Sequence, residues 1–204
     1  RVNVVNPDAV LRGSKIWTGE WRAQRAAALA EGLAALGQGT VGAPERDRSG
    51  ASNSLTLDRP LSVRRAPNGF LFVNGTPTDC VNVAITHVLK AKPDLIVSGI
   101  NKGWNLGDDV TYSGTVSAAL EGALLSIPSI AVSTQNRRNG DFEFGPGAKA
   151  AAAVAEAVLQ RGMPKFTLLN INVPFGPNKG FKVTVQAKRN HITVVSERMD
   201  PRHQ

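Results

Sequence analysis

Cysteine, histidine and aromatic residues are scarce in this chain of 204 residues. Cys80 is the only cysteine, so no disulfide can form within the chain and no cysteine-rich zinc site can be built. This cysteine usage predicts a cytoplasmic protein. The histidines at 87, 191 and 203 are too dispersed to suggest a zinc site. Aromatic residues make up 5% of the chain, with one tyrosine, so there is no aromatic run on which nucleic-acid bases could stack.

Long hydrophobic runs are absent as well. No apolar stretch approaches the roughly 20 residues that span a bilayer, and the first residues lack the apolar core of a secretion signal. We therefore expect no membrane partner. With 42% hydrophobic residues, 20% charged residues and no low-complexity tract, the chain should fold. Its length favours a single domain over residues 1–204.

Acidic residues are outnumbered by basic ones. Lysine and arginine total 24 against 16 aspartates and glutamates, which gives a formal charge of +8 and favours phosphate-bearing partners. The basic residues occur as scattered pairs such as Arg64 and Arg65. A basic nucleic-acid-binding protein is therefore an alternative supported by net charge alone, and we do not expect nucleic acid to be the partner.

Strand-like and helix-like segments alternate along the chain. Strands are predicted at 2–5, 40–43, 94–98, 129–133 and 166–173, and helices at 22–36, 78–88, 113–124 and 148–160. Such alternation predicts an α/β fold with a mostly parallel sheet covered on both faces, where ligands bind at the carboxyl ends of the strands. Residues 55–57 and 69–73 bracket a basic turn and predict a projecting β-hairpin or arm. Two further strand-like runs are expected after Phe181.

The residues Ser113-Gly114-Thr115 open one of the predicted helices. A helix N-terminus offers free N–H groups and the positive end of the helix dipole, so this turn is a candidate phosphate-binding site. Gly114 would let the backbone approach the anion. The alternative is that Ser113 only caps its helix.

Three polar loops follow predicted strands and should meet at one edge of the sheet. They carry Asp8, Ser49 and Asn101, whose oxygen atoms suit a hard divalent cation such as Mg²⁺ or Mn²⁺. Taken singly, each has a simpler interpretation, as a turn aspartate, a loop hydroxyl and a left-handed turn residue.

Four segments, at 43–57, 75–81, 93–122 and 168–174, closely resemble the SurE family of 5'/3'-nucleotidases, and the resemblance runs in order over residues 28–201. It implies a Rossmann-like, three-layer α/β/α fold and a divalent metal cofactor. It also implies hydrolysis of nucleoside 5'- and 3'-monophosphates and of short polyphosphate. Homodimers or homotetramers built by exchanged C-terminal segments are implied too. Compared with the family, we expect the oligomerisation segment of this chain to be incomplete.

Carried over residue by residue, the resemblance assigns metal binding to Ser49 and Asn101, and phosphate binding to residues 113–115. The family also has two adjacent aspartates in an Asn-Asp-Asp-Gly turn after the first strand. The nearest match here is Asn6-Pro7-Asp8-Ala9, which keeps one aspartate. A second alignment places the pair at Thr18-Gly19, where no aspartate occurs. We prefer the first alignment because a β-branched strand precedes Asn6.

Together these inferences predict a metal-dependent phosphomonoesterase of the nucleotidase type, in which a metal-activated water attacks phosphorus. Asp8 and Asn101 are the candidate catalytic residues, and Asn6, Asn53 and Asn105 are candidate substrate-loop residues. The missing aspartate supports an alternative from another class, a non-catalytic nucleotide- or phosphate-binding protein.

Overall fold

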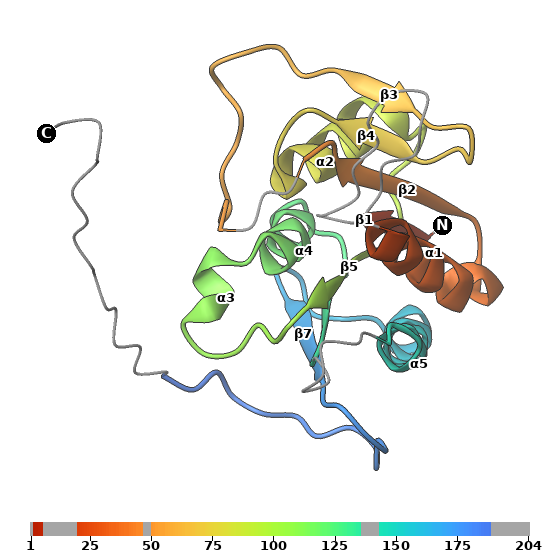
Figure 1. The fold of residues 1–204 in the computed structure, drawn as a ribbon, viewed down its shortest axis with the longest axis vertical. Helices are drawn as coiled ribbons and strands as arrows, with labels where there is room; N and C mark the ends of the chain where they lie inside the picture. The colour runs from red at the N-terminus through yellow and green to blue at the C-terminus, as the bar shows by residue number, and fades with distance from the viewer. Residues whose placement is uncertain (1, 6–19, 47–49, 136–142, 189–204) are drawn as a thin grey trace, which may run out of the picture.

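The computed structural model describes residues 2–5, 20–46, 50–135 and 143–188. Within these residues the chain forms a seven-stranded sheet in the order β3-β4-β2-β1-β5-β6-β7 (Figure 1). Neighbouring strands are parallel except β3 and β4, which are antiparallel. The strands are β1 (Val2–Val5), β2 (Gly39–Pro44), β3 (Val63–Arg65), β4 (Leu71–Val73), β5 (Leu95–Lys102), β6 (Ser129–Thr134) and β7 (Leu168–Val173).

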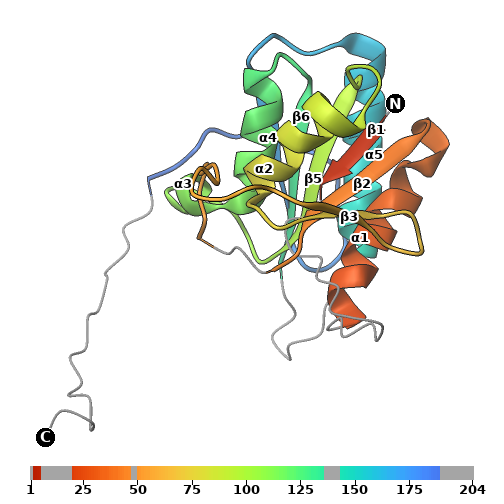
Figure 2. The same ribbon diagram turned by 90° about the horizontal axis from the view of Figure 1, so that it is seen from above.

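Helices cover both faces of this sheet (Figure 2). Helices α1 (Glu20–Leu33) and α5 (Gly145–Arg161) lie on one face, and α2 (Pro77–Val83) and α4 (Gly114–Leu124) lie on the other. Shorter helical segments are η1 (Ala34–Leu36), η2 (Ala84–Val88) and α3 (Asp109–Tyr112). The structure confirms the predicted three-layer α/β/α fold with a mostly parallel sheet.

The core follows from the alternation of side chains along the buried strand β5. Leu95 and Val97 point to the face covered by α1 and α5, where they pack in one cluster with Leu29. Ile96 points to the opposite face and packs with Ala118 of α4. Residues 95–100 of β5 are buried on both faces, which is why the strand begins with the apolar run Leu95-Ile96-Val97.

The predicted hairpin is present, but it differs from the expectation in two ways. Its first strand is β3 (Val63–Arg65) instead of residues 55–57, and its second strand, β4, pairs with β2. The hairpin therefore extends the edge of the sheet and does not project as an arm. The physical reason is that Leu71–Val73 is fully buried, whereas Thr56 bonds to the side chain of Asp79 and has no strand partner.

The chain after β7 is extended through residue 188 and forms no strand over that described part. The strand-like runs expected there are therefore not found between 181 and 188, and residues 189–204 lie outside the described residues. The side chains of Phe181, Val183 and Val185 are exposed. Within the described ranges, no helix has the length and apolar character required to cross a membrane.

Candidate functional site

The carboxyl ends of three parallel strands meet at one edge of the sheet. Strand β1 lies between β2 and β5 and is parallel to both, so the last residues of these strands, Val5, Pro44 and Lys102, lie at the same edge of the sheet. The segments that follow these strands in the sequence carry the predicted metal ligands. Asn6, Asp8 and Ser49 themselves lie outside the described residues. Asp8 follows β1 by three positions, and Ser49 directly precedes the described segment that begins at Gly50.

Asn101 lies near the end of β5, immediately after an irregularity in the pairing of β5 with β6 between Ser98 and Asn101. Gly99 makes this irregularity possible, because its φ is +135° and a Cβ atom there would lie 2.5 Å from the carbonyl oxygen of Val132. No other residue type fits this position. Gly99 therefore determines the position of Asn101 near the end of β5.

The side-chain amide of Asn101 is oriented by its neighbours. Its Nδ2 donates to the carbonyl oxygen of Gly103 at 3.0 Å, and its own backbone carbonyl accepts from Thr134 Oγ1 at 3.3 Å. Its Oδ1 forms no hydrogen bond within the part of the chain that the structure describes. A neutral amide oxygen in this state is a suitable ligand for a hard divalent cation.

Helix α4 begins at the same edge of the sheet. Ser113 is its N-cap residue, and its Oγ accepts a hydrogen bond from the backbone N–H of Val116 at 3.2 Å. The interpretation that Ser113 caps the helix is thus correct. It leaves the phosphate-binding interpretation open, because the hydroxyl proton can still donate to an anion. The N–H groups of Gly114 and Thr115 belong to the first turn, which has no intrahelical acceptor.

A hydrogen bond connects the loop after β2 with the turn before α4. Ser52 Oγ donates to the carbonyl oxygen of Thr111, in α3, at 2.8 Å. The residues that follow Ser49 are therefore held against the segment that leads into Ser113. Asn53, in the same loop, is exposed, and its Oδ1 accepts from Thr78 Oγ1 at 3.0 Å.

Asn105, a candidate substrate-loop residue, has a buried side chain that faces the sheet. It is 6% exposed, and its Nδ2 donates to Ser133 Oγ at 2.7 Å. Its backbone N–H donates to Asn172 Oδ1 at 2.9 Å, and its carbonyl accepts from the Nδ2 atoms of Asn170 and Asn172. These contacts fix residues 103–107 to β6 and β7 and leave the neighbouring Trp104 41% exposed.

Negatively charged ligands are the missing component of a metal site among these residues. The ranges that the structure describes contain no group of three histidine, cysteine, aspartate or glutamate side chains that could hold a metal ion. The oxygen of Asn101 fits a hard cation, and Asp8, the carboxylate that the family resemblance adds to it, lies outside the described residues.

Sequence reasoning missed one group of polar side chains, at the start of α2. The helix predicted from residue 78 begins at Pro77, its N-cap is Thr76, and Thr76 and Asp79 form a capping box. Asp79 is 2% exposed and also binds the loop after β2. The spacing of a threonine followed three residues later by an acidic residue was the signal in the sequence.

Comparison with known proteins agrees with the α/β/α fold and with the resemblance to the SurE family. The family described as "Survival protein SurE" matches residues 18–193. A 5'-nucleotidase SurE of Laribacter hongkongensis is 52% identical over 178 residues, which cover 86% of this chain and 71% of that protein. The corresponding protein of Methylobacillus flagellatus is 52% identical over 179 residues, covering 86% and 72%. The crystal structure of the SurE protein from Aquifex aeolicus superimposes with a TM-score of 0.78 at 42% identity, over 93% of this chain and 73% of that one. The chain therefore belongs to the SurE family.

Proposed function

We propose that this protein is a metal-dependent phosphatase that hydrolyses nucleoside monophosphates. Two features support the proposal: the N-terminus of α4 at Ser113, which suits phosphate, and the amide oxygen of Asn101, which has no hydrogen-bond partner among the described residues and suits a divalent cation. Both lie at the carboxyl edge of the sheet. The relatives named 5'-nucleotidase SurE support the same activity.

In the proposed mechanism, residues from different loops at this edge bind the metal ion and the phosphate. Asp8, Ser49 and Asn101 would hold Mn²⁺ or Mg²⁺. The ion would act as a Lewis acid and lower the pKa of a water molecule. Asp8 orients the attacking water. The N–H groups of Gly114 and Thr115 and the hydroxyls of Ser113 and Thr115 bind the phosphate oxygens. Their donors also stabilise the negative charge that develops on those oxygens in the transition state.

Two alignments assign the metal-binding aspartates of this site to different positions in the sequence. Strand β1 occupies the centre of the sheet, which supports Asp8, three residues beyond its end. The family match begins at residue 18, which supports the alignment that places the aspartate pair at Thr18-Gly19. We propose Asp8 because Asn6 directly follows β1, the strand that pairs with β5, whereas residues 18–19 directly precede helix α1 in the sequence.

Several finer points belong to the same proposal. Hydrolysis of 3'-monophosphates and short polyphosphate is part of it, as is a cytoplasmic location. A homodimer or homotetramer is supported by apolar side chains that segment 175–185 exposes to solvent. These are Phe175 (53% exposed), Phe181 (66%), Val183 (98%) and Val185 (91%). Sedimentation of the purified chain measures the oligomeric state.

The experiment that tests the activity is phosphate release from AMP under a Mn²⁺ titration. We expect release that depends on the metal and stops with EDTA. Asn101→Ala should reduce it by at least about 100-fold, since the variant loses an oxygen ligand of the ion. Asn68→Ala is the matched control, because Asn68 is exposed in the turn before β4, at the opposite, amino-terminal edge of the sheet.

Absence of metal-dependent release from the folded wild-type chain would contradict the proposal. If that chain still binds AMP, the non-catalytic nucleotide-binding protein takes its place. A binding affinity for long DNA or RNA that falls steeply with salt would instead favour the nucleic-acid-binding alternative.

A further inference from the structure

The carboxylate of Asp79 is buried and joins two segments that are distant in the sequence. Its Oδ2 accepts from the backbone N–H of Thr76 at 2.7 Å, which caps helix α2, and from Thr56 Oγ1 at 2.6 Å. Its Oδ1 accepts from the backbone N–H of Thr56 at 3.1 Å. Burying a charge is costly unless it is well hydrogen-bonded. The cap uses one of these three bonds, and the other two hold Thr56.

The same turn binds two more residues of the loop after β2. Thr76 Oγ1 donates to the carbonyl oxygen of Ser54 at 2.7 Å, and Thr78 Oγ1 donates to Asn53 Oδ1 at 3.0 Å. Thr76 and Thr78 are themselves buried. The rigid first turn of α2 therefore fixes the loop at three of its four positions from 53 to 56.

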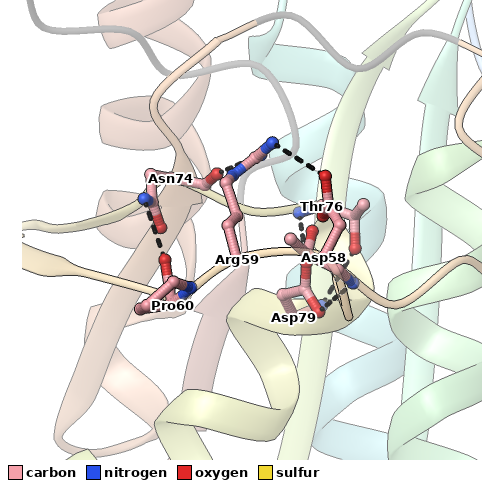
Figure 3. Close-up of polar contacts among 7 residues, drawn as sticks. Asp58, Arg59, Pro60, Asn74, Thr76 and Asp79 are labelled. Carbon is pink, nitrogen blue, oxygen red and sulfur yellow. Dashed lines mark hydrogen bonds and ion pairs between the residues drawn. The ribbon is translucent and has the colours of Figure 1, made fainter.

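The backbone before this turn is adapted to the buried carboxylate. A Cβ atom at Gly75 would overlap the side chain of Asp79, so the position admits only glycine. Figure 3 shows Thr76 and Asp79 together at the start of α2.

A second group of contacts holds the following part of the same loop, and it is exposed. Asn74 donates from Nδ2 to the carbonyl oxygen of Pro60 and accepts at Oδ1 from the backbone N–H of Ser62 at 2.8 Å. Arg59 donates to the carbonyl oxygen of Asn74 at 3.0 Å (Figure 3). These bonds secure residues 59–62 and not residues 50–56.

The fixed part of the loop reaches the candidate phosphate site through one residue. Ser52, next to Asn53, donates to the carbonyl oxygen of Thr111, two residues before the N-cap Ser113. This bond links residues 53–56 to α3, which directly precedes the first turn of α4.

We propose that Asp79 is a positioning residue for phosphate binding, acting through Thr56 and the loop 52–56 on the turn that precedes Ser113. This inference rests on the proposed function for the identity of the site. It does not require turnover, because its effect falls on phosphate affinity.

Thr56→Val tests the inference with little risk to folding, because it removes the loop's hydroxyl and leaves the cap bond between Thr76 and Asp79 intact. We expect the affinity for inorganic phosphate, measured by calorimetry with Mn²⁺ present, to fall about 10-fold, as for loss of one charge-assisted bond. The KM for AMP should rise by a similar factor, and amide hydrogen exchange should quicken at residues 50–56. Asp79→Asn should show the same changes, larger in size.

Three controls separate positioning from general stability. Thr56→Ser restores the hydroxyl and should recover phosphate affinity. Thr86→Val removes an exposed hydroxyl that bonds to Asn82 within the same helical region, and Asn74→Ala releases residues 59–62. Both should leave phosphate affinity unchanged.

Wild-type phosphate affinity in Thr56→Val would overturn the inference, as would an equal loss in Asn74→Ala. If the wild-type chain binds phosphate but releases none from AMP, the proposed function fails, and the phosphate affinities of these variants still decide the role of Asp79.

Discussion

Ser113 caps helix α4, and we propose that the same side chain also binds phosphate. Its oxygen accepts from the N–H of Val116 and so caps α4, while its hydroxyl proton remains able to donate to an anion. Thr115 follows it in the first helical turn and is 2% exposed, so its rotamer is restricted by packing. A phosphate bound here meets donors that need little reorganisation.

Removing both hydroxyls should weaken phosphate binding. We expect the Ser113→Ala, Thr115→Ala double variant to lose about 1 to 3 kcal/mol of binding free energy for inorganic phosphate or AMP. Ser113→Gly separates binding from capping, because glycine is tolerated at the N-cap at a cost of a few tenths of a kcal/mol. Calorimetry on variants with native circular dichroism measures the change. Unaltered affinity in the double variant excludes the phosphate site at α4.

The single aspartate of the loop after β1 leads to a prediction about charge. Pro7→Asp adds a carboxylate next to Asp8, so both the apparent affinity for Mn²⁺ and the rate of AMP hydrolysis should increase by about 10-fold or more. Thr18→Asp is the matched control, since it adds the same charge at the position of the other alignment. An increase with Thr18→Asp alone would show that the metal-binding turn lies at residues 18–19 and not at residues 6–9. An increase with neither variant would show that no added carboxylate reaches the ion from these turns.

At the scale of elements, α2 contributes to the sheet face opposite α1 and also holds the loop after β2. Its cysteine, Cys80, is buried in the cluster that includes Val81 and Ile96. Burial raises the pKa of the Cys80 thiol well above its ordinary value, and the neighbouring Asp79 carboxylate raises this pKa further. The thiol therefore stays protonated in the folded protein, in agreement with a packing role.

This raised pKa predicts a contribution to stability that is lost in alkali. The unfolded chain releases the thiol proton at a lower pH than the folded chain, so above about pH 8.5 the unfolded state binds fewer protons. The free energy of unfolding should then fall as pH rises, whereas the contribution is fully present at neutral pH. Urea unfolding at pH 7.5 and pH 10 should show a larger loss for the wild type than for Cys80→Ala. Equal losses in both proteins would contradict the burial argument.

At the scale of the whole molecule, the alternation of strands and helices was enough to predict the layered fold and the edge at which the loops meet. The first strand of the hairpin could not be predicted in the same way. Val63–Arg65 is a short edge strand, exposed along its length and rich in charge, so it carries no apolar alternation. Residues 55–57 have that pattern, but side-chain bonds to α2 hold them outside the sheet.

The candidate site was predictable where the local sequence carries the geometry, and not where distant segments decide it. The cap at Ser113 depends on residues within one turn. The inward orientation of Asn105 depends on partners 28 and 67 positions away, in β6 and β7. The hydrogen bond between Thr56 and Asp79 likewise joins residues 23 positions apart. Such contacts become visible only when the strand order is known.

We propose that the metal ligands and the helix N-terminus act on one phosphate at one edge of the sheet. The most direct test is the affinity for inorganic phosphate measured by calorimetry with and without Mn²⁺. If both ligands share the site, Mn²⁺ tightens phosphate binding, phosphate tightens Mn²⁺ binding by the same factor, and Asn101→Ala removes this coupling. We predict a coupling of about 10-fold or more. Phosphate affinity that is independent of Mn²⁺ in the wild-type protein would show that the ion and the helix N-terminus do not share one phosphate.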